Sequence, residues 1–543
     1  MGTITGGCRE RDTVFGLELV VVLGATILVC GALARRLGVA PPVLLLLGGV
    51  LLGFVPALRQ AHFPPELMLL VFLPVLLYWE ALTTSLREIR ANFRGIALTS
   101  TLLVVATAAA VAATAHAMGV PWGPAWVLGA ALAPTDATAV GALARTLPRR
   151  TVTILRAESL VNDGTALVIY GVAVGVTVGE ETLTAGHVAW LVVLAYGGGI
   201  LVGAVVAVLG VQVRQRITDP LLSNVAILLI PFTAYLLAEL IDASGVLAVV
   251  VAGLAMSQAG PRIGRADARQ QTTAFWSLAT FLLNASLFVL VGIEAQNAVR
   301  NLVSFDVGTA ILAVVAVCGV ILAVRLAFLV VSAYAIRLID RRPSQRLRRV
   351  SNRARVVSTV AGFRGAVSLA AALAVPTTLS SGEAFPDRDL IVFVTAGVVA
   401  TTLVVQGLLL APAARWAHLP ADDRIAGERQ LADESATQEA LAAMDDVAEQ
   451  LGTDREVVDR LREEYDEHLR VLRARSSDDE ETDPAVRYDE QYSALRLALL
   501  GHKRAAVVRL RDERRIDDIV LRQVQARLDI EELRLARGEP ATE

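Results

Sequence analysis

The sequence predicts an all-α polytopic membrane protein of about thirteen transmembrane helices, with inverted repeats and two broken crossing helices, followed by a helical cytoplasmic domain. The 543-residue chain is 55% hydrophobic, which is more apolar than an ordinary soluble protein. The apolar residues form repeated blocks of roughly 20 residues, the length that crosses a bilayer as a helix. These blocks stop near residue 418, where the composition becomes charged. We therefore expect a transmembrane domain over 1–418 and a cytoplasmic tail over 419–543.

The apolar blocks define the expected membrane spans in order along the chain. The first block is longer than the core of a signal peptide and has no convincing cleavage site, so we interpret it as a retained span. The two spans that meet at 240–243 are joined by a very short loop. The expected spans are about 13–34, 39–58, 66–84, 96–118, 121–144, 155–179, 187–211, 221–240, 243–259, 274–294, 307–336, 357–379 and 389–415.

The loops between these spans alternate in charge, and the alternation predicts the orientation of the chain. Every loop that follows an odd-numbered span is basic, from Arg35 and Arg36 through to the arginines of 337–355. Cytoplasmic loops of membrane proteins carry an excess of Lys and Arg. We therefore expect a plasma-membrane protein with its N-terminus outside and its C-terminal tail in the cytoplasm. The intervening loops contain only Arg59, Arg300 and Arg388.

The tail has apolar residues at helical spacing, which predicts amphipathic helices. One helix is expected over 440–451 and a second over 457–472, opened by a capping box of Thr453 and Glu456. An acidic break precedes further helix over 485–536. A charged helical domain could regulate, dimerise or be a soluble appendage, and composition does not choose among these roles.

A small set of ionisable residues lies well inside the expected spans. Charged side chains at this depth are costly, so they usually face a protein interior or a water-filled cavity and have a function. No histidine lies in the middle of a span, so we expect carboxylates to carry any proton traffic. The set consists of Glu80, Asp136, Glu158, Asp163, Arg325 and Arg364.

Two of these acids belong to one span, within Glu-Ser-Leu-Val-Asn-Asp at 158–163, but they lie on different faces. At about 100° per residue, Asn162 lies about 40° from Glu158, and Asp163 is rotated roughly 100° beyond Asn162. Asp163 can therefore face a cavity that Glu158 does not share. Ser159 lies near Asp163 at i, i+4 and can supply a hydroxyl oxygen. We expect Asp163 to bind the ligand and Glu158 to pair with a cation.

Two spans contain residues that interrupt a helix. In the fifth span, Pro134 precedes Thr135 and Asp136, and proline removes a helix hydrogen bond and clashes with the preceding turn. In the twelfth span, Gly-Phe-Arg-Gly at 362–365 interrupts an apolar helix. Paired broken helices in the two halves of a chain indicate a midplane binding site in inverted-repeat transporters. The spacing fits inverted repeats made of spans 1–6 and 8–13.

Arg364 requires a counter-ion, because an unpaired arginine at this depth is costly. Glu158 is the first candidate and Glu80 the second. For Arg325, a structural or snorkelling role is favoured over a role in the site. Function and structure explain Glu80 equally well, whereas function is favoured for Asp163 and Asp136.

These residues closely resemble the cation:proton antiporter family that includes bacterial NhaP-type exchangers and the animal sodium/proton exchangers. The resemblance covers about residues 13–415, and its four motifs together are highly specific. The motifs are Pro-Thr-Asp at 134–136, Glu-Ser and Asn-Asp within 158–163, Gly-Phe-Arg-Gly-Ala-Val-Ser at 362–368, and Glu80 after Leu-Leu-Tyr at 76–78.

The resemblance implies roles for individual residues. The residue matching Asp163 binds Na⁺ (or Li⁺) and the proton alternately, and those matching Thr135, Ser159 and Asp136 line the site. The matches of Glu158 and Arg364 form an ion pair. The resemblance also implies a homodimer in which a six-helix core bundle moves against a dimer domain.

Competition at one carboxylate then predicts the mode of transport. Asp163 can hold one Na⁺ or one H⁺ but not both, and Asn162 beside it offers dipoles without a titrating charge. We therefore expect electroneutral one-for-one exchange that serves sodium transport and pH homeostasis, with Asn162 in the ion site and Glu80 as an accessory residue. No cofactor, catalytic motif or nucleic-acid partner is expected. The alternatives are a K⁺/H⁺ antiporter, a cation channel, and a membrane enzyme or sensor that uses the tail.

Overall fold

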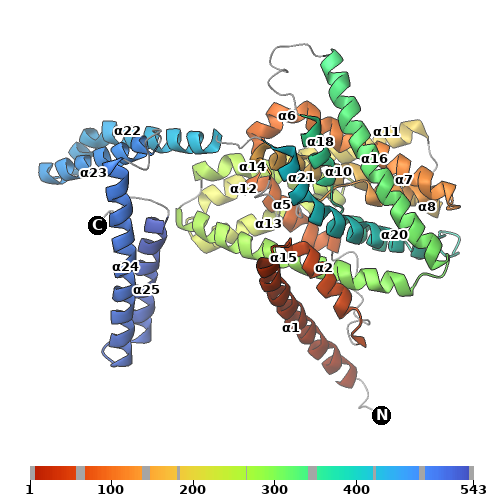
Figure 1. The fold of residues 1–543 in the computed structure, drawn as a ribbon, viewed down its shortest axis with the longest axis horizontal. Helices are drawn as coiled ribbons and strands as arrows, with labels where there is room; N and C mark the ends of the chain where they lie inside the picture. Colours follow the sequence, from red (N-terminus) through yellow and green to blue (C-terminus); the bar gives the residue numbers. More distant parts are fainter. Residues whose placement is uncertain are drawn as a thin grey trace. The chain divides into compact units, whose positions relative to one another are not determined.

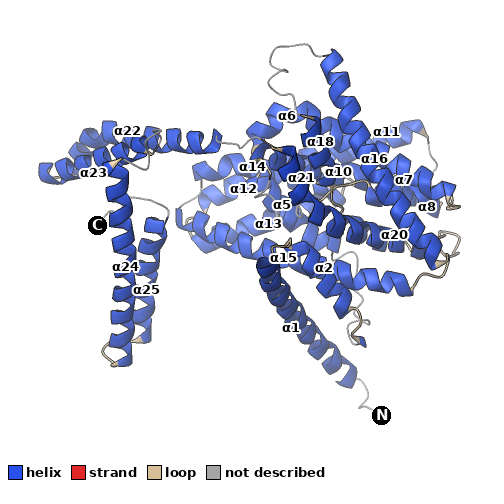
Figure 2. Ribbon diagram, viewed as in Figure 1, coloured by secondary structure: helices blue, strands red, loops and turns tan. Residues whose placement is uncertain are grey.

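The structure is a computed structural model that describes residues 6–56, 68–136, 147–179, 184–263, 266–339, 351–419, 424–475 and 483–536. Within these ranges the chain is helical and contains no strand, apart from one isolated bridge between Thr378 and Ala384 (Figure 2). The chain divides into two compact units, Met1–Ala421 and Asp422–Glu543 (Figure 1). The predicted all-α class is confirmed.

The first unit contains the apolar helices. Nine helical segments in the described ranges are long and apolar enough to cross a membrane, and Pro41–Leu52 and Leu70–Thr83 are shorter apolar helices. Each of the thirteen predicted spans overlaps described helix, but the count of thirteen stays a prediction. The helices are α1 (Gly6–Leu37), α2 (Pro41–Leu52), α5 (Leu73–Thr83), α6 (Leu86–Leu98), α7 (Val104–Ala117), α8 (Trp122–Leu132), α10 (Arg149–Val178), α11 (Ala185–Val193), α12 (Gly199–Arg216), α13 (Pro220–Glu239), α14 (Gly245–Ile263), α15 (Ala266–Arg300), α16 (Val307–Ile339), α18 (Asn352–Val360), α19 (Ala366–Leu373), α20 (Arg388–Thr401) and α21 (Gly407–Ala417).

The predicted breaks in the fifth and twelfth spans are both present, and they lie against each other. Helix α8 ends before a non-helical stretch, 133–136, which contains Pro134. Helices α18 and α19 are separated by a second non-helical stretch, 361–365. The Asp136 N–H donates to the Phe363 carbonyl at 2.8 Å. Backbone groups that each helix leaves without an internal partner thus pair across the two non-helical stretches. Both helices are interrupted at the predicted positions, and residues 137–144 of the fifth predicted span lie outside the described residues.

Helix α15 passes close to the centre of the unit, where it contacts α5 and α19. Its C-terminal part packs on α2 through two glycines, because a Cβ on Gly292 would lie only 2.8 Å from the Gly49 Cα. Small residues that let backbones approach closely are typical of helix contacts in membranes. This contact holds α15 at the position from which it reaches the site described below.

The second unit consists of α22 (Arg424–Leu451), α23 (Arg455–Ala474), α24 (Pro484–Asp512) and α25 (Asp518–Ala536). Leu500, Leu528 and Leu535 form the buried contact between α24 and α25, which lie side by side (Figure 1). The predicted capping box is wrong by one position. The N-cap of α23 is Asp454, and its side chain makes no capping hydrogen bond.

Candidate functional site

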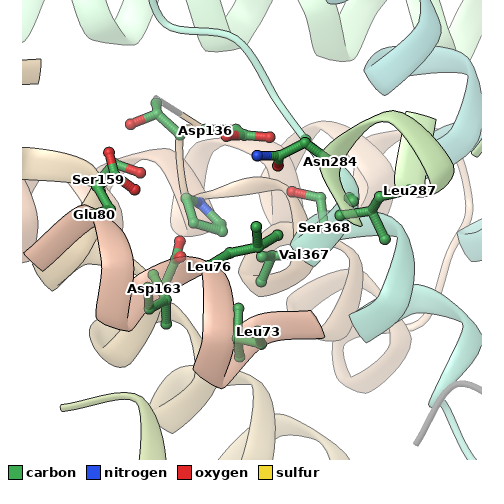
Figure 3. A pocket seen from close by; sticks show the side chains of 15 residues that line it. Leu73, Leu76, Glu80, Asp136, Ser159, Asp163, Asn284, Leu287, Val367 and Ser368 are labelled. Atoms are coloured by element: carbon green, nitrogen blue, oxygen red, sulfur yellow. The ribbon is translucent and has the colours of Figure 1, made fainter. Parts of the chain in front are cut away.

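A cavity lies where α5, the first break, α10, α15 and α19 meet (Figure 3). Its volume is about 40 Å³. A cavity needs roughly 10–15 Å³, measured in the same way, to hold one water molecule. The cavity can therefore accommodate a small cation with few waters. Its apolar lining includes Leu73 and Leu76 of α5 and Leu287 of α15. The polar lining residues are Glu80, Thr135, Asp136, Ser159, Asp163, Asn284 and Ser368.

Three carboxylates face this one cavity from three separate segments. Glu80 comes from α5, Asp136 from the first break and Asp163 from α10. Asp163 is almost fully buried, and Figure 3 shows its carboxylate directed into the cavity. Carboxylate and hydroxyl oxygens are the ligands that hard cations prefer. Mutual repulsion among the carboxylates favours the binding of either a cation or protons.

The break gives Asp136 its place in the cavity. Its backbone is fixed by the hydrogen bond to the Phe363 carbonyl, and its side chain lies against the Cα of Gly365. Any Cβ at position 365 would collide with the Asp136 side chain. The glycine of the second break is therefore required by the carboxylate of the first.

The two acids of α10 face different surroundings, as helical geometry predicts. Asp163 lines the cavity, whereas Glu158 does not. Glu158 Oε1 instead accepts from Arg325 Nη1 at 2.6 Å, in an ion pair of which both side chains are buried. Arg325 also donates through Nε to the Ser358 carbonyl at 3.1 Å. The pair joins α10 to α16 and to α18.

Among the described residues the predicted partner of Glu158, Arg364, makes no ion pair with it, although the two charges interact electrostatically. Arg364 is buried, and it donates through Nε to the Leu132 carbonyl at 3.1 Å and through Nη1 to the Gly362 carbonyl at 2.5 Å. The Leu132 carbonyl ends α8 and the Gly362 carbonyl lies in the second break, where backbone acceptors have no helical partners. Arg364 therefore ties the two breaks together, and Arg325 is the ion-pair partner of Glu158.

Asn162 stands behind the cavity wall. Its Nδ2 donates to Thr135 Oγ1 at 2.7 Å, and Thr135 lines the cavity whereas Asn162 does not. The sequence places Asn162 in the ion site itself, but the structure gives it an indirect position. It holds the threonine of the break against α10.

Sequence reasoning missed two polar residues of the cavity. Ser368 of α19 lies in the motif at 362–368 of the twelfth span, which by itself does not assign its hydroxyl to the site. Asn284 lies alone within the apolar sequence of α15, and its depth in the span is the signal that could have identified it. Arg325 was given a structural or snorkelling role, and the structure supports the structural one.

Residues 24–416 match the family described as sodium/hydrogen exchanger, transmembrane. The chain belongs to the sodium/hydrogen exchanger family. The exchanger is thus a multi-pass membrane protein of a transporter family whose activity is cation/proton exchange, and the family predicted from the sequence is confirmed.

Several relatives resemble this exchanger over most of its length. A protein of Mycobacterium tuberculosis strain H37Rv, named as an uncharacterized Na⁺/H⁺ exchanger, is 45% identical over 97% of both chains. A low-affinity Na⁺/H⁺ antiporter of Synechocystis, NhaS1, is 31% identical over 67% of each chain.

A solved structure has the same fold. The sodium proton antiporter MjNhaP1 of Methanocaldococcus jannaschii matches with a TM-score of 0.57 at 18% identity, over 74% of the exchanger and 99% of that chain. At this identity the match shows the fold alone. It agrees with the helical membrane fold that the sequence predicts.

Proposed function

We propose that this exchanger moves Na⁺ or Li⁺ in one direction and H⁺ in the other by competition at Asp163. The observation that carries the proposal is the buried carboxylate of Asp163 in a cavity with room for one small cation. An isolated carboxylate is costly at this depth, so it binds either a cation or a proton. Each ligand excludes the other, and the exclusion couples the two fluxes.

The surrounding residues then have distinct tasks in the proposal. Thr135, Asp136 and Ser159 supply further oxygens to the cation, and Glu80 faces them from α5 as an accessory carboxylate. Asn162 orients Thr135 through its hydrogen bond. The Glu158–Arg325 and Arg364 contacts hold α10 and the two breaks in register and touch no transported ion in this proposal. No cofactor beyond the transported ions is required.

Asp163→Asn tests the carrier role. The amide cannot exchange a proton, so we expect cation-driven proton movement to be lost. The assay is dequenching of a pH-sensitive dye in proteoliposomes with Na⁺, Li⁺ or K⁺ over a range of pH. Asp242→Asn is the matched control, because Asp242 lies outside the cavity and asparagine tolerates its left-handed backbone. Robust exchange by Asp163→Asn would refute the proposal.

We further propose one-for-one, electroneutral exchange. Asp163 would be the single group that changes its proton during the cycle, while Glu80 and Asp136 keep their protonation states. An imposed membrane voltage should then leave the exchange rate of sealed vesicles unchanged. A rate that follows the voltage would contradict this stoichiometry and would implicate one of the other two cavity carboxylates as a second carrier.

K⁺/H⁺ exchange is a second candidate, because one relative points to a broader choice of ion. A protein of Bacillus pumilus named sodium, potassium, lithium and rubidium/H⁺ antiporter is 31% identical over 72% of this chain and 60% of its own. The oxygen ligands in the cavity do not by themselves select among alkali cations. The K⁺ arm of the same dequenching assay distinguishes the two candidates.

We also propose the setting in which exchange occurs. The alternating arginine loops support a plasma-membrane orientation with the N-terminus outside and the C-terminus in the cytoplasm. The family supports a homodimer and a core bundle that moves against a dimer domain. A cation channel is disfavoured, since a buried titrating carboxylate has no evident task in a pore. Cation flux without proton counterflow would favour the channel.

A further inference from the structure

We propose that Asn284 is a specificity-determining residue: its amide oxygen contacts the transported cation from the α15 side of the cavity. It would set cation affinity and discrimination among alkali cations without binding a proton. The inference rests on the proposed function, in which the cation occupies this cavity. It adds a neutral ligand from a wall other than the one that holds Asp163.

The first observation is the position of Asn284. It lines the cavity on α15, one helical turn from Leu287, which also lines it. Figure 3 shows its amide extending from α15 toward the cavity. Asp163 lies on α10 and Asp136 on the first break. A cation in the cavity is therefore approached by oxygens from more than one direction.

The second observation is a buried oxygen without a partner. Asn284 Oδ1 is shielded from solvent and accepts no hydrogen bond within the described part of the chain. Buried polar groups are nearly always satisfied, and an orphaned one is costly. The Thr280 hydroxyl, one turn earlier on α15, donates to the Trp276 carbonyl at 2.6 Å and is satisfied locally. Of these two neighbouring side chains of α15, Asn284 is therefore the one whose oxygen lacks a hydrogen-bond donor.

The chemistry of an amide fits a site that alternates between two ligands. Its carbonyl oxygen can contact a cation, and its NH₂ group can donate to a carboxylate. Rotation about the last side-chain bond exchanges the two ends. Asn284 can therefore face the cavity with its oxygen when the cation is bound and with its NH₂ group when the cation has left. Neither state requires a change of protonation.

Asn284→Ala tests the inference in the full-length exchanger. The variant is reconstituted in proteoliposomes and its apparent KM for Na⁺, Li⁺ and K⁺ is measured over a range of pH. We expect the Na⁺ KM at alkaline pH to rise roughly fivefold, the size of one neutral polar contact. We expect kcat to stay near that of the wild type, and the KM ratio between Na⁺ and K⁺ to change. The inhibition constant for protons should not move, because the amide does not titrate.

Two further variants separate ligand binding from structure. Asn284→Ser keeps a shorter oxygen and should recover part of the lost affinity. Asn297→Ala removes the same residue type from α15 outside the cavity and should leave KM unchanged. A lower kcat at unchanged KM, or equal loss for all three cations without recovery by serine, would overturn the inference, as would an unchanged KM in Asn284→Ala. If the wild type shows no exchange, or Asp163→Asn remains active, the proposed function itself fails.

Discussion

Gly365 lies directly against Asp136, and replacing it with alanine changes the shape of the cavity without removing any of its polar groups. An alanine Cβ would lie 2.5 Å from the Asp136 Cβ, whereas ordinary contact begins at 3.4 Å. The Asp136 Cβ and the backbone of residue 365 must therefore move apart by about 0.9 Å, from 3.4 − 2.5. Rotation of the side chain cannot relieve this contact, because Cβ is fixed to the backbone. The backbone itself is held by the hydrogen bond to Phe363.

A displacement of about 1 Å in a positioned group commonly costs on the order of 100-fold in rate. We therefore expect Gly365→Ala to lose about 100-fold in the initial rate of Na⁺-driven proton movement in the dequenching assay. Gly319→Ala is the control, since a Cβ there meets no atom within 4 Å. Gel filtration after heating compares the stability of the variants. Exchange by Gly365→Ala within threefold of the wild type, at equal protein density, would refute the reasoning.

The other predictions concern the ion pair and the tail. Arg325→Ala leaves the Glu158 carboxylate buried without its partner, which should destabilise the first unit by about 3–5 kcal/mol. The loss should appear as a lower melting temperature, with a smaller loss in Arg325→Lys, and an unchanged melting curve would show that the pair contributes little. In the tail, burial lowers the pKa of His468, so the unfolded state binds its proton more readily. The stability that the neutral His468 side chain gives to α23 should be fully present above about pH 6.5. It should be lost as the pH drops toward the lowered pKa. Amide exchange in α23, corrected for its intrinsic pH dependence, should therefore be faster at acidic pH. His468→Gln should remove that difference, and its persistence would assign the effect to another group.

The fold could be predicted from the sequence because the sequence patterns that indicate it are local. Each apolar block is long enough to be recognised by itself, and Pro134 marks a break wherever the helix around it lies. The family and fold class predicted on this basis are confirmed by the family match and by the helical structure. That Glu158 and Asp163 point in different directions was also predictable, because it follows from the spacing of two positions in one helix.

The hydrogen-bond and ion-pair partners of the buried arginines could not be predicted from local sequence patterns. The sequence offers two arginines for Glu158, and the choice depends on the distance between spans that are far apart in the chain. Arg364 uses the Leu132 and Gly362 carbonyls, which become acceptors only once both helices are broken and crossed. Asn284 is a similar case, because one asparagine in an apolar span does not reveal whether its face meets lipid or a cavity.

The contact between the two breaks has a consequence for biosynthesis. Arg364 and the Leu132 carbonyl that it binds are 232 residues apart, and chains emerge from the ribosome at about 5–20 residues per second. For at least roughly ten seconds, therefore, the first break has been synthesised and the second break has not. During that interval the Asp136 N–H and the Leu132 carbonyl need temporary partners, such as water or the insertion machinery. A half-made chain accordingly lacks the second wall of the cavity, and a nascent exchanger gains its site only near the end of its insertion.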